Sequence, residues 1–245
     1  MKPRVGFFDF TGCEGCQLTI LNLAEKLLDV LDLVEVVEFR EVQGHCNEDL
    51  DIAFVEGSIC RPDEEKRLRM IRTRSKKLIT LGACADLAGI NIALEEAGGA
   101  ELAMAVYGSD SKHLQGGQAR PVSGIVPIDG RIPGCPVDGQ EFLSILHALL
   151  LDRPTNLPAF SLCVECKLAE LPCTFEQGIV CLGPVVRAGC NALCIEGGDR
   201  CRGCRGLVDN PRESSYHRVL ETFNRSVDDI LEEYRTYNLR IDEES

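Results

Sequence analysis

The sequence predicts an α/β protein in which a doubly wound parallel sheet is followed by a cysteine-rich module. Over about the first 150 residues, apolar β-type runs alternate with amphipathic helical stretches, which is the pattern of a parallel sheet with helices on its faces. Glycine-containing turns follow several of these runs, as expected where a strand passes into a helix. Beyond this region apolar periodicity is weak, and eight cysteines are concentrated between Cys163 and Cys204.

The predicted elements of the sheet domain follow one another in a regular order. An apolar β-rich run at residues 5–10 ends in Thr11-Gly12, and leucines at helical spacing follow at residues 17–31. Further strands are predicted at residues 34–39, 52–55 and 78–81, and further helices at residues 62–74, 85–97 and 138–151. A proline opens the helix at 62–74, where the N–H that it lacks would have no partner in any case. Residues 108–123 are predicted as a polar loop.

A linker and two further parts follow the sheet domain. Residues 151–158 contain two prolines among polar residues, as is typical of a linker. We therefore predict a sheet domain at 1–152, a cysteine-rich domain at 153–210, and a C-terminal helix with an acidic tail at 211–245, the helix covering residues 216–237. The cysteine-rich part has too little apolar periodicity for a conventional core, so metal ligation would supply the folding free energy that burial does not.

The net charge of -13 and the composition argue against several classes of partner. An acidic chain with four histidines, little clustering of lysine and no tryptophan is poorly suited to bind nucleic acid or an anionic membrane. No apolar stretch approaches the roughly 18 residues of a membrane span, and the first apolar run is too short for a signal peptide. We therefore expect a cytoplasmic protein without membrane insertion, in which so many cysteines (14 in all) are better explained by metal ligation than by disulfide bridges.

The eight clustered cysteines make two complete sets of four. Four thiolates are the ligand set of a tetrahedral zinc site or of an iron–sulfur cube. Zinc remains a competitor, because paired Cys-x-x-Cys units also occur in zinc ribbons. The run of closely spaced cysteines found in bacterial ferredoxins is absent, so the clusters would not be of the ferredoxin type. The eight are Cys163, Cys166, Cys173, Cys181, Cys190, Cys194, Cys201 and Cys204.

A third set of four thiols is predicted in the sheet domain. Cys13, Cys16 and Cys84 each follow a predicted strand, and Cys135 lies in a turn of glycine and proline. The carboxyl ends of parallel strands form the edge where such sheets hold their ligands. A redox-active dithiol at Cys13 and Cys16 is an alternative, but it leaves Cys84 and Cys135 unexplained. The third set favours iron–sulfur chemistry over zinc for the whole chain.

The cysteine motifs resemble those of the small subunits of nickel–iron (NiFe) hydrogenases, within the NADH:ubiquinone oxidoreductase 20 kDa-like family. The likeness is to the delta subunits of cytoplasmic sulfhydrogenase and NADP-linked complexes, and it covers about residues 5–206. The motifs in order are Thr11-Gly-Cys-Glu-Gly-Cys-Gln17, Phe54-Val-Glu-Gly-Ser58, Gly82-Ala-Cys84, Gly134-Cys-Pro136, Cys163-Val-Glu-Cys166, Cys181-Leu-Gly-Pro184, Arg187-Ala-Gly-Cys190 and Cys201-Arg-Gly-Cys204.

The resemblance implies a flavodoxin-like domain, a C-terminal iron–sulfur domain and three 4Fe-4S clusters. A proximal cluster would be held by Cys13, Cys16, Cys84 and Cys135, a distal one by Cys163, Cys166, Cys173 and Cys181, and a medial one by Cys190, Cys194, Cys201 and Cys204. The hydrogen chemistry would take place at the NiFe centre of a separate large subunit, so this chain would carry no catalytic residue. Diaphorase-type flavin and iron–sulfur subunits with FAD and NAD(P), or a ferredoxin, would be the electron partners.

Two residues depart from the uptake-type relatives. Those relatives carry a histidine where Cys163 stands and lack a cysteine at the position of Cys194, which gives them a three-iron medial cluster. Thiolates at both positions imply three 4Fe-4S centres and lower reduction potentials, which suit a nicotinamide or ferredoxin partner. Three arginines close to ligands in the sequence are candidates to offset cluster charge: Arg187, Arg202 and Arg205.

Two other functions remain open. One is the small subunit of a heterodisulfide reductase-linked hydrogenase or of a related electron-wiring complex, although Cys13-Glu-Gly-Cys16 and the cysteine-rich tail count against a complex I type. The other is a zinc-stabilised regulatory protein. Cys46 and Cys60 have no place in the ligand scheme, while Glu14 and Glu56 are candidates for the large-subunit interface or a proton path.

Overall fold

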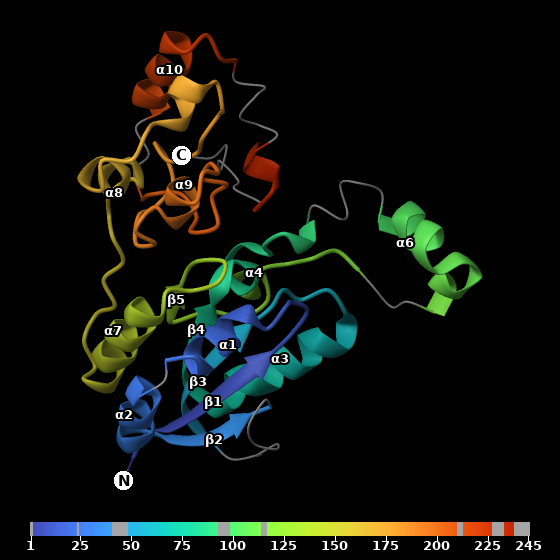
Figure 1. Cartoon of the computed structure of the whole chain (residues 1–245). Coiled ribbons are helices and arrows are strands. Elements are labelled where there is room, and N and C mark those ends of the chain that lie inside the picture. Colours follow the sequence, from blue (N-terminus) through green and yellow to red (C-terminus); the bar gives the residue numbers. More distant parts are fainter. Residues whose placement is uncertain are drawn as a thin grey trace. The chain divides into compact units, whose positions relative to one another are not determined.

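A computed structural model describes residues 2–23, 25–40, 49–92, 99–113, 117–209, 213–226 and 233–237 (Figure 1). The chain divides into two compact units, 1–155 and 156–245. The boundary lies within the segment 151–158. The finer division into three parts stays a prediction.

The first unit contains a five-stranded sheet in the order β2-β1-β3-β4-β5, with every neighbouring pair parallel. The predicted α/β class is confirmed. The strand order changes direction between β1 and β3, which makes the carboxyl ends of these two strands the switch point of the sheet. The strands are β1 (Arg4–Asp9), β2 (Glu35–Phe39), β3 (Leu50–Glu56), β4 (Ser75–Leu81) and β5 (Gly130–Ile132).

Helices connect the strands and cover the sheet. They are α1 (Gly15–Leu21), α2 (Glu25–Leu33), α3 (Pro62–Arg74), α4 (Gly82–Leu87), α6 (Gly99–Tyr107) and α7 (Gly139–Leu150), with short 3-10 helices η1 (Gly108–His113) and η2 (Val122–Gly124). The Asp138 carboxylate accepts a hydrogen bond of 2.8 Å from the Glu141 N–H and so caps the first turn of α7.

Phenylalanines on adjacent positions of β1 show which helix covers which face. Phe7 and Phe8 point to opposite faces because side chains alternate along a strand. Phe7 stacks on Phe54, with ring centroids 5.1 Å apart, and the Phe54 ring lies 5.4 Å from that of Phe142 on α7. Phe8 lies in one core cluster with Leu68 of α3. Helices α7 and α3 therefore pack on opposite faces of the sheet.

Three sequence predictions in this unit were wrong in extent. The single helix predicted at 17–31 is two helices, since α1 ends at Leu21 with Asn22 as its C-cap and α2 begins at Glu25. The helix predicted at 85–97 begins earlier, at Gly82, and ends where Ala88 and Gly89 adopt positive φ, while residues 93–98 lie outside the described part of the chain. The loop predicted from residue 108 begins as η1, after the unpredicted helix α6.

One strand was not predicted at all. Strand β5 has three residues, too few to show an alternating pattern, and it forms through pairing with β4, where Ile79 lies opposite Gly130.

The second unit contains short elements joined by long ordered loops. These are α8 (Cys163–Leu168), the 3-10 helix η3 (Thr174–Gln177), α9 (Leu193–Glu196) and α10 (Glu213–Thr222). The helix predicted at 216–237 was wrong in extent, since α10 ends at Thr222, just before Asn224 adopts a left-handed φ of 52°. The Tyr216 hydroxyl of α10 donates a hydrogen bond of 3.1 Å to the Cys181 carbonyl.

Gly57 follows β3 at the carboxyl edge of the sheet, where the backbone of Phe10 packs closely against it. Its φ is +93°, and an added Cβ would lie 2.6 Å from the Phe10 carbonyl carbon. Gly108 also has a positive φ, of +56°, but open space surrounds its Cβ position. Alanine at either position carries left-handed strain of about 1–2 kcal/mol, whereas only Gly57→Ala adds a backbone clash.

We predict that Gly57→Ala lowers the free energy of unfolding by at least about 2 kcal/mol more than Gly108→Ala does. Denaturant unfolding followed by circular dichroism measures both losses. Equal losses would show that the Phe10 backbone does not lie this close to Gly57.

Candidate metal centres

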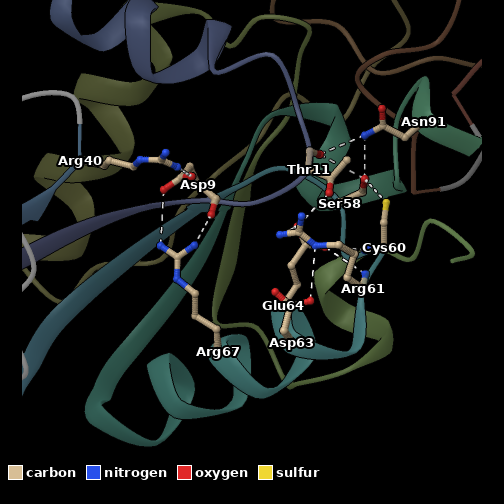
Figure 2. Close-up of polar contacts among 10 residues, drawn as sticks. All are labelled: Asp9, Thr11, Arg40, Ser58, Cys60, Arg61, Asp63, Glu64, Arg67 and Asn91. Atoms are coloured by element: carbon tan, nitrogen blue, oxygen red, sulfur yellow. Dashed lines mark hydrogen bonds and ion pairs between the residues drawn. The ribbon is translucent and has the colours of Figure 1, made fainter. Parts of the chain in front are cut away.

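Side-chain hydrogen bonds hold together the loops that leave β1 and β3 (Figure 2). The Asn91 amide donates to the Thr11 carbonyl (3.0 Å) and to the Ser58 hydroxyl oxygen (2.7 Å). The buried carboxylate of Glu64 accepts from the Thr11 hydroxyl (2.8 Å) and from the Cys60 N–H (2.9 Å). These bonds fix the start of the loop that carries the first cysteine motif.

Asp9, at the end of β1, anchors two arginines beside this network (Figure 2). Burial by itself would raise the pKa of Asp9, but the hydrogen bond from Arg40 and the charge of Arg67 outweigh it, so the pKa lies below its usual value. The carboxylate is therefore ionised at neutral pH and holds the strand end to α3, which carries Arg67.

Four cysteines of the first unit lie at the carboxyl edge of the sheet. Cys13 is in the loop after β1, Cys16 is on α1, Cys84 is on α4 directly after β4, and Cys135 follows β5. Cys84 interacts electrostatically with Cys135 and Cys13, and Cys16 interacts with Cys135. The structure thus brings together the four thiols that the sequence placed in three separate loops. We call them the sheet thiols.

The buried carboxylate of Glu56 fixes the first turn of the helix that carries Cys16. Glu56 ends β3 and is 4% exposed. Its two oxygens accept hydrogen bonds of 3.0 Å each from the backbone N–H groups of Cys16 and Gln17. Burial and then the charge of Glu56 raise the pKa of the Cys16 thiol. The sequence left the role of Glu56 open, and the structure makes it a backbone anchor.

Glycine is required where the backbone approaches the sheet thiols most closely. An added Cβ at Gly82, which has a φ of +84°, would lie 2.4 Å from the Cys16 sulfur. At Gly89 the same atom would lie 2.8 Å from the Cys84 sulfur. Each position thus leaves room for sulfur only because it has no side chain.

Four thiols of the second unit gather around α8. Cys163 and Cys166 lie on this helix, and Cys163 interacts electrostatically with Cys181, Cys166 and Cys173. An added Cβ at Gly183 would lie 3.4 Å from both the Cys163 and the Cys181 sulfur atoms, so these two sulfurs are separated by no more than twice that distance. We call this group the α8 thiols.

The other four thiols of this unit form a neighbouring group. Cys190 interacts electrostatically with Cys194, and Cys201 interacts with Cys204 and Cys190. We call this group the α9 thiols, after the helix that carries Cys194. Cys201 also interacts with Cys181, and its N–H donates to the Cys181 sulfur at 3.3 Å. The two groups therefore lie side by side.

Glu165 links the two groups through the backbone. It lies between Cys163 and Cys166, and its carboxylate accepts hydrogen bonds from the N–H groups of Gly189 (2.7 Å) and Ala192 (3.2 Å), on either side of Cys190. Asn191 and Ala192 both have positive φ, of 53° and 54°, and at the alanine this conformation costs roughly 1–2 kcal/mol. The sequence analysis missed Glu165, although its place between two cysteines was a usable signal.

Backbone N–H groups approach the sulfur atoms. In the α8 group, the Cys181 sulfur accepts hydrogen bonds from the Gly183 N–H at 3.4 Å and from the Cys201 N–H at 3.3 Å. Elsewhere the backbone N–H groups of Val137, Ile90, Ala192 and Gly203 act to lower the pKa of Cys16, Cys84, Cys190 and Cys201, against the effect of burial. Hydrogen bonds from N–H groups to sulfur are one of the means by which proteins stabilise and tune iron–sulfur clusters.

Metal binding would change the protonation state of these thiols. Burial raises the pKa of Cys84 and Cys163 to about 12 and that of Cys166 to about 11, so without a metal these thiols keep their protons at neutral pH. A bound metal cation reverses this preference and makes thiolate ligands of them. The residues thus fit a positively charged group that binds several sulfurs.

The spacing of the thiols can be compared with two kinds of centre. Among the residues described, no three or more cysteine, histidine or acidic side chains converge closely enough to hold one metal ion. Four thiolates on a single zinc ion each lie about 2.3 Å from it. The four thiolates of an iron–sulfur cube bind four different iron atoms and need not converge on one point.

The remaining sequence candidates have different surroundings. The Cys60 sulfur lies 3.5 Å from the Ser58 hydroxyl oxygen, and the side chain is partly exposed. Cys46 lies outside the described residues. Both amide atoms of Gln17 are buried without a hydrogen-bond partner, directly beside the ligand candidate Cys16.

No helix in the described part of the chain is long and apolar enough to cross a membrane.

Sequence comparisons match the first unit to a known family. The family model of the NADH ubiquinone oxidoreductase 20 kDa subunit matches residues 13–149. The delta subunit of sulfhydrogenase 2 from Pyrococcus furiosus is 37% identical over 210 residues, which covers 84% of this chain and 88% of that protein. A subunit of the vhu F420-non-reducing hydrogenase of Methanocaldococcus jannaschii is 33% identical, over 85% and 83% of the two chains.

Two solved structures share the fold at low sequence identity. A chain of an NAD+-reducing NiFe hydrogenase superposes with a TM-score of 0.58 at 24% identity, over 64% of this chain and 96% of that one. A chain of the Desulfomicrobium baculatum NiFeSe hydrogenase gives a TM-score of 0.59 at 18% identity, over 88% and 98% of the two chains. The chain belongs to the NADH ubiquinone oxidoreductase 20 kDa subunit family, and its relatives there include subunits of sulfhydrogenase and of F420-non-reducing hydrogenases.

Proposed function

We propose that this chain is the electron-transferring small subunit of a cytoplasmic NiFe hydrogenase and that its twelve grouped cysteines hold three 4Fe-4S clusters. The observation that carries the proposal is the gathering of twelve cysteines into three groups of four, at the carboxyl edge of the sheet, around α8 and around α9. Relatives named as hydrogenase subunits across most of the chain support it.

The proposed ligand sets follow the three groups. The sheet thiols Cys13, Cys16, Cys84 and Cys135 would hold the proximal cluster. The α8 thiols Cys163, Cys166, Cys173 and Cys181 would hold the distal cluster, and the α9 thiols Cys190, Cys194, Cys201 and Cys204 the medial one. The electrostatic interactions of Cys163 with the other three α8 thiols support the distal set. Cys201 interacts with Cys181 of that set as well as with Cys204 and Cys190, so the two sets are adjacent.

The clusters would supply one-electron carriers, and the chain's own residues would set where electrons enter and leave. Cys13 and Cys135 are exposed at the sheet edge, which suits an approach by the large subunit that bears the NiFe centre. Cys173 and Cys194 are exposed in the second unit, which suits electron exchange with another partner. Glu56 and Glu165 hold the ligand loops in place, which keeps the geometry of the thiolates constant as the charge of a cluster changes.

Diaphorase-type subunits with FAD and NAD(P) are the proposed electron partners. The delta subunit of the NAD-reducing hydrogenase HoxS of Cupriavidus necator is 26% identical over 64% of this chain, which supports a nicotinamide-linked complex. Thiolates at all twelve positions favour low potentials, as such a partner requires.

A second candidate is the small subunit of a hydrogenase that delivers electrons elsewhere, for example to a heterodisulfide reductase. The relatives named as subunits of F420-non-reducing hydrogenases favour this candidate. The proteins that co-purify distinguish the two: a flavin subunit that reduces NAD(P) supports the first, and a heterodisulfide-reducing partner supports the second.

We predict that the anaerobically purified complex contains roughly twelve iron and twelve acid-labile sulfide per copy of this chain, beyond the iron of its partners, together with nickel. Elemental analysis of the complex and of this chain separated from it measures both. Zinc in place of iron would exclude electron transfer through these sites. Iron without nickel or hydrogen activity would exclude the hydrogenase assignment.

Substitution of Cys194 tests the ligand partition. We predict that Cys194→Ala converts one 4Fe-4S cluster into a three-iron form, because one iron loses its protein ligand. Electron paramagnetic resonance of the oxidised complex detects the new signal. Cys60→Ala is the matched control, since Cys60 lies outside the three groups, and it should leave the spectrum unchanged. An unchanged spectrum in Cys194→Ala contradicts the assignment of Cys194.

A further inference from the structure

The C-terminal residues of the second unit pack on the loops that carry its cysteines. We call the described parts of this region, residues 213–226 and 233–237, the C-terminal strap. Tyr216 of α10 is 5% exposed, and its hydroxyl donates a hydrogen bond of 3.1 Å to the Cys181 carbonyl. The strap is thus bonded to the backbone of one of the α8 thiols.

Two further contacts join the strap to a loop between two of the α8 thiols. Phe223 stacks on Phe175 of η3, with ring centroids 5.4 Å apart, and Phe175 is itself buried. Such aromatic pairs stabilise a contact beyond the area that they bury. The Arg225 guanidinium donates to the Gly178 carbonyl in the same loop. The strap therefore covers this loop from Phe175 to Gly178.

An ion pair holds the last described part of the strap. Arg200 directly precedes Cys201, and its guanidinium lies 2.5 Å from the Glu233 carboxylate. The two side chains are 28% and 13% exposed, so water screens this pair less than it screens a pair on the surface. Arg200 Nε and Glu233 Oε2 are buried without a hydrogen-bond partner, which lowers the net stabilisation that the contact provides. Loss of one charge should therefore be enough to release this part of the strap.

The strap reaches the two most buried thiols of the unit. Cys181 is 7% exposed and Cys201 is 6% exposed, whereas the other thiols of the α8 and α9 groups are half-buried or exposed. The Cys201 N–H donates to the Cys181 sulfur at 3.3 Å, so these two thiols mark the junction of the two groups. Tyr216 contacts the backbone of the first thiol, and Arg200 adjoins the second. Because protein groups around a metal centre control the access of solvent to it, the strap can keep water from this junction.

We propose that the C-terminal strap, held closed by the Arg200–Glu233 ion pair, shields the junction between the two iron–sulfur clusters of the second unit from solvent. The inference rests on the proposed function. Local opening of the strap, rather than unfolding of the unit, would then set how fast water and small solutes reach the junction. Cys173 and Cys194 are exposed while the strap is closed, so electron exchange at these positions does not require opening.

Hydrogen–deuterium exchange of the whole complex, followed by mass spectrometry, measures the access of water to the junction. In Glu233→Gln we expect the peptides that contain the N–H groups of Leu182 and Cys201 to exchange at least about fivefold faster than in the wild type. The peptide that contains the Gly189 N–H is the internal reference, because this group bonds to a carboxylate of α8 and not to the strap.

Iron release to a water-soluble chelator of ferrous iron, followed anaerobically, tests whether this access extends to the clusters. In Glu233→Gln the clusters of the α8 and α9 thiols should lose iron at least about fivefold faster, while the cluster of the sheet thiols keeps the wild-type rate. Electron paramagnetic resonance distinguishes the clusters during the reaction. Glu221→Gln is the matched control, because Glu221 is exposed on α10, and it should leave both rates unchanged.

The outcomes separate the inference from the function beneath it. If the wild-type chain holds no iron at the α8 and α9 thiols, the proposed function fails. If that iron is present, the inference is overturned when either rate in Glu233→Gln rises less than about fivefold, or when Glu221→Gln or the sheet thiols show the same acceleration.

A second variant decides if Glu233→Gln fails to assemble the clusters. Tyr216→Phe keeps the ring and removes only the hydroxyl that donates to the Cys181 carbonyl. A rise of at least about twofold in both rates, as expected for the loss of one hydrogen bond, supports the shielding role of the strap. A smaller rise overturns it.

Discussion

The close approach of the backbone to cysteine sulfur is the constraint on which the described arrangement depends. An added Cβ at Gly82 would lie 2.4 Å from the Cys16 sulfur, and one at Gly89 would lie 2.8 Å from the Cys84 sulfur. In the second unit, the Cys181 sulfur accepts hydrogen bonds from the N–H groups of Gly183 and Cys201. The backbone of these loops therefore leaves room for the sulfur atoms, and at Gly82 and Gly89 only glycine with a positive φ provides it.

Buried carboxylates perform the complementary task of holding these loops to the rest of their units. Glu56 binds two N–H groups at the start of α1, and Glu165 binds two N–H groups around Cys190. In each case an acidic side chain acts on the backbone of a ligand loop that is distant in the sequence. The two units share no fold, yet both use a carboxylate with two N–H donors to position a thiol. Such anchors suit a centre whose charge changes while its geometry stays constant.

Local patterns in the sequence predicted much of the fold and all twelve thiols of the three groups. Strands β1 and β3 contain continuous apolar runs because they are buried, and the cysteine spacing is a local signal that needs no tertiary structure. The anchoring by Glu56 could not be predicted, because its partner Cys16 is 40 positions away in the chain. The burial of Arg205 was equally inaccessible, since it arises from the pairing of two loops.

The central claim is that three groups of thiols hold three iron–sulfur cubes, and anomalous X-ray scattering at the iron absorption edge tests it most directly. Anaerobically grown crystals of the complex should show twelve iron positions on this chain in three compact groups of four. One group should lie against Cys13, Cys16, Cys84 and Cys135, and the other two against the α8 thiols and the α9 thiols. Single isolated peaks at these sites, or peaks that appear at the zinc edge instead, would contradict the account.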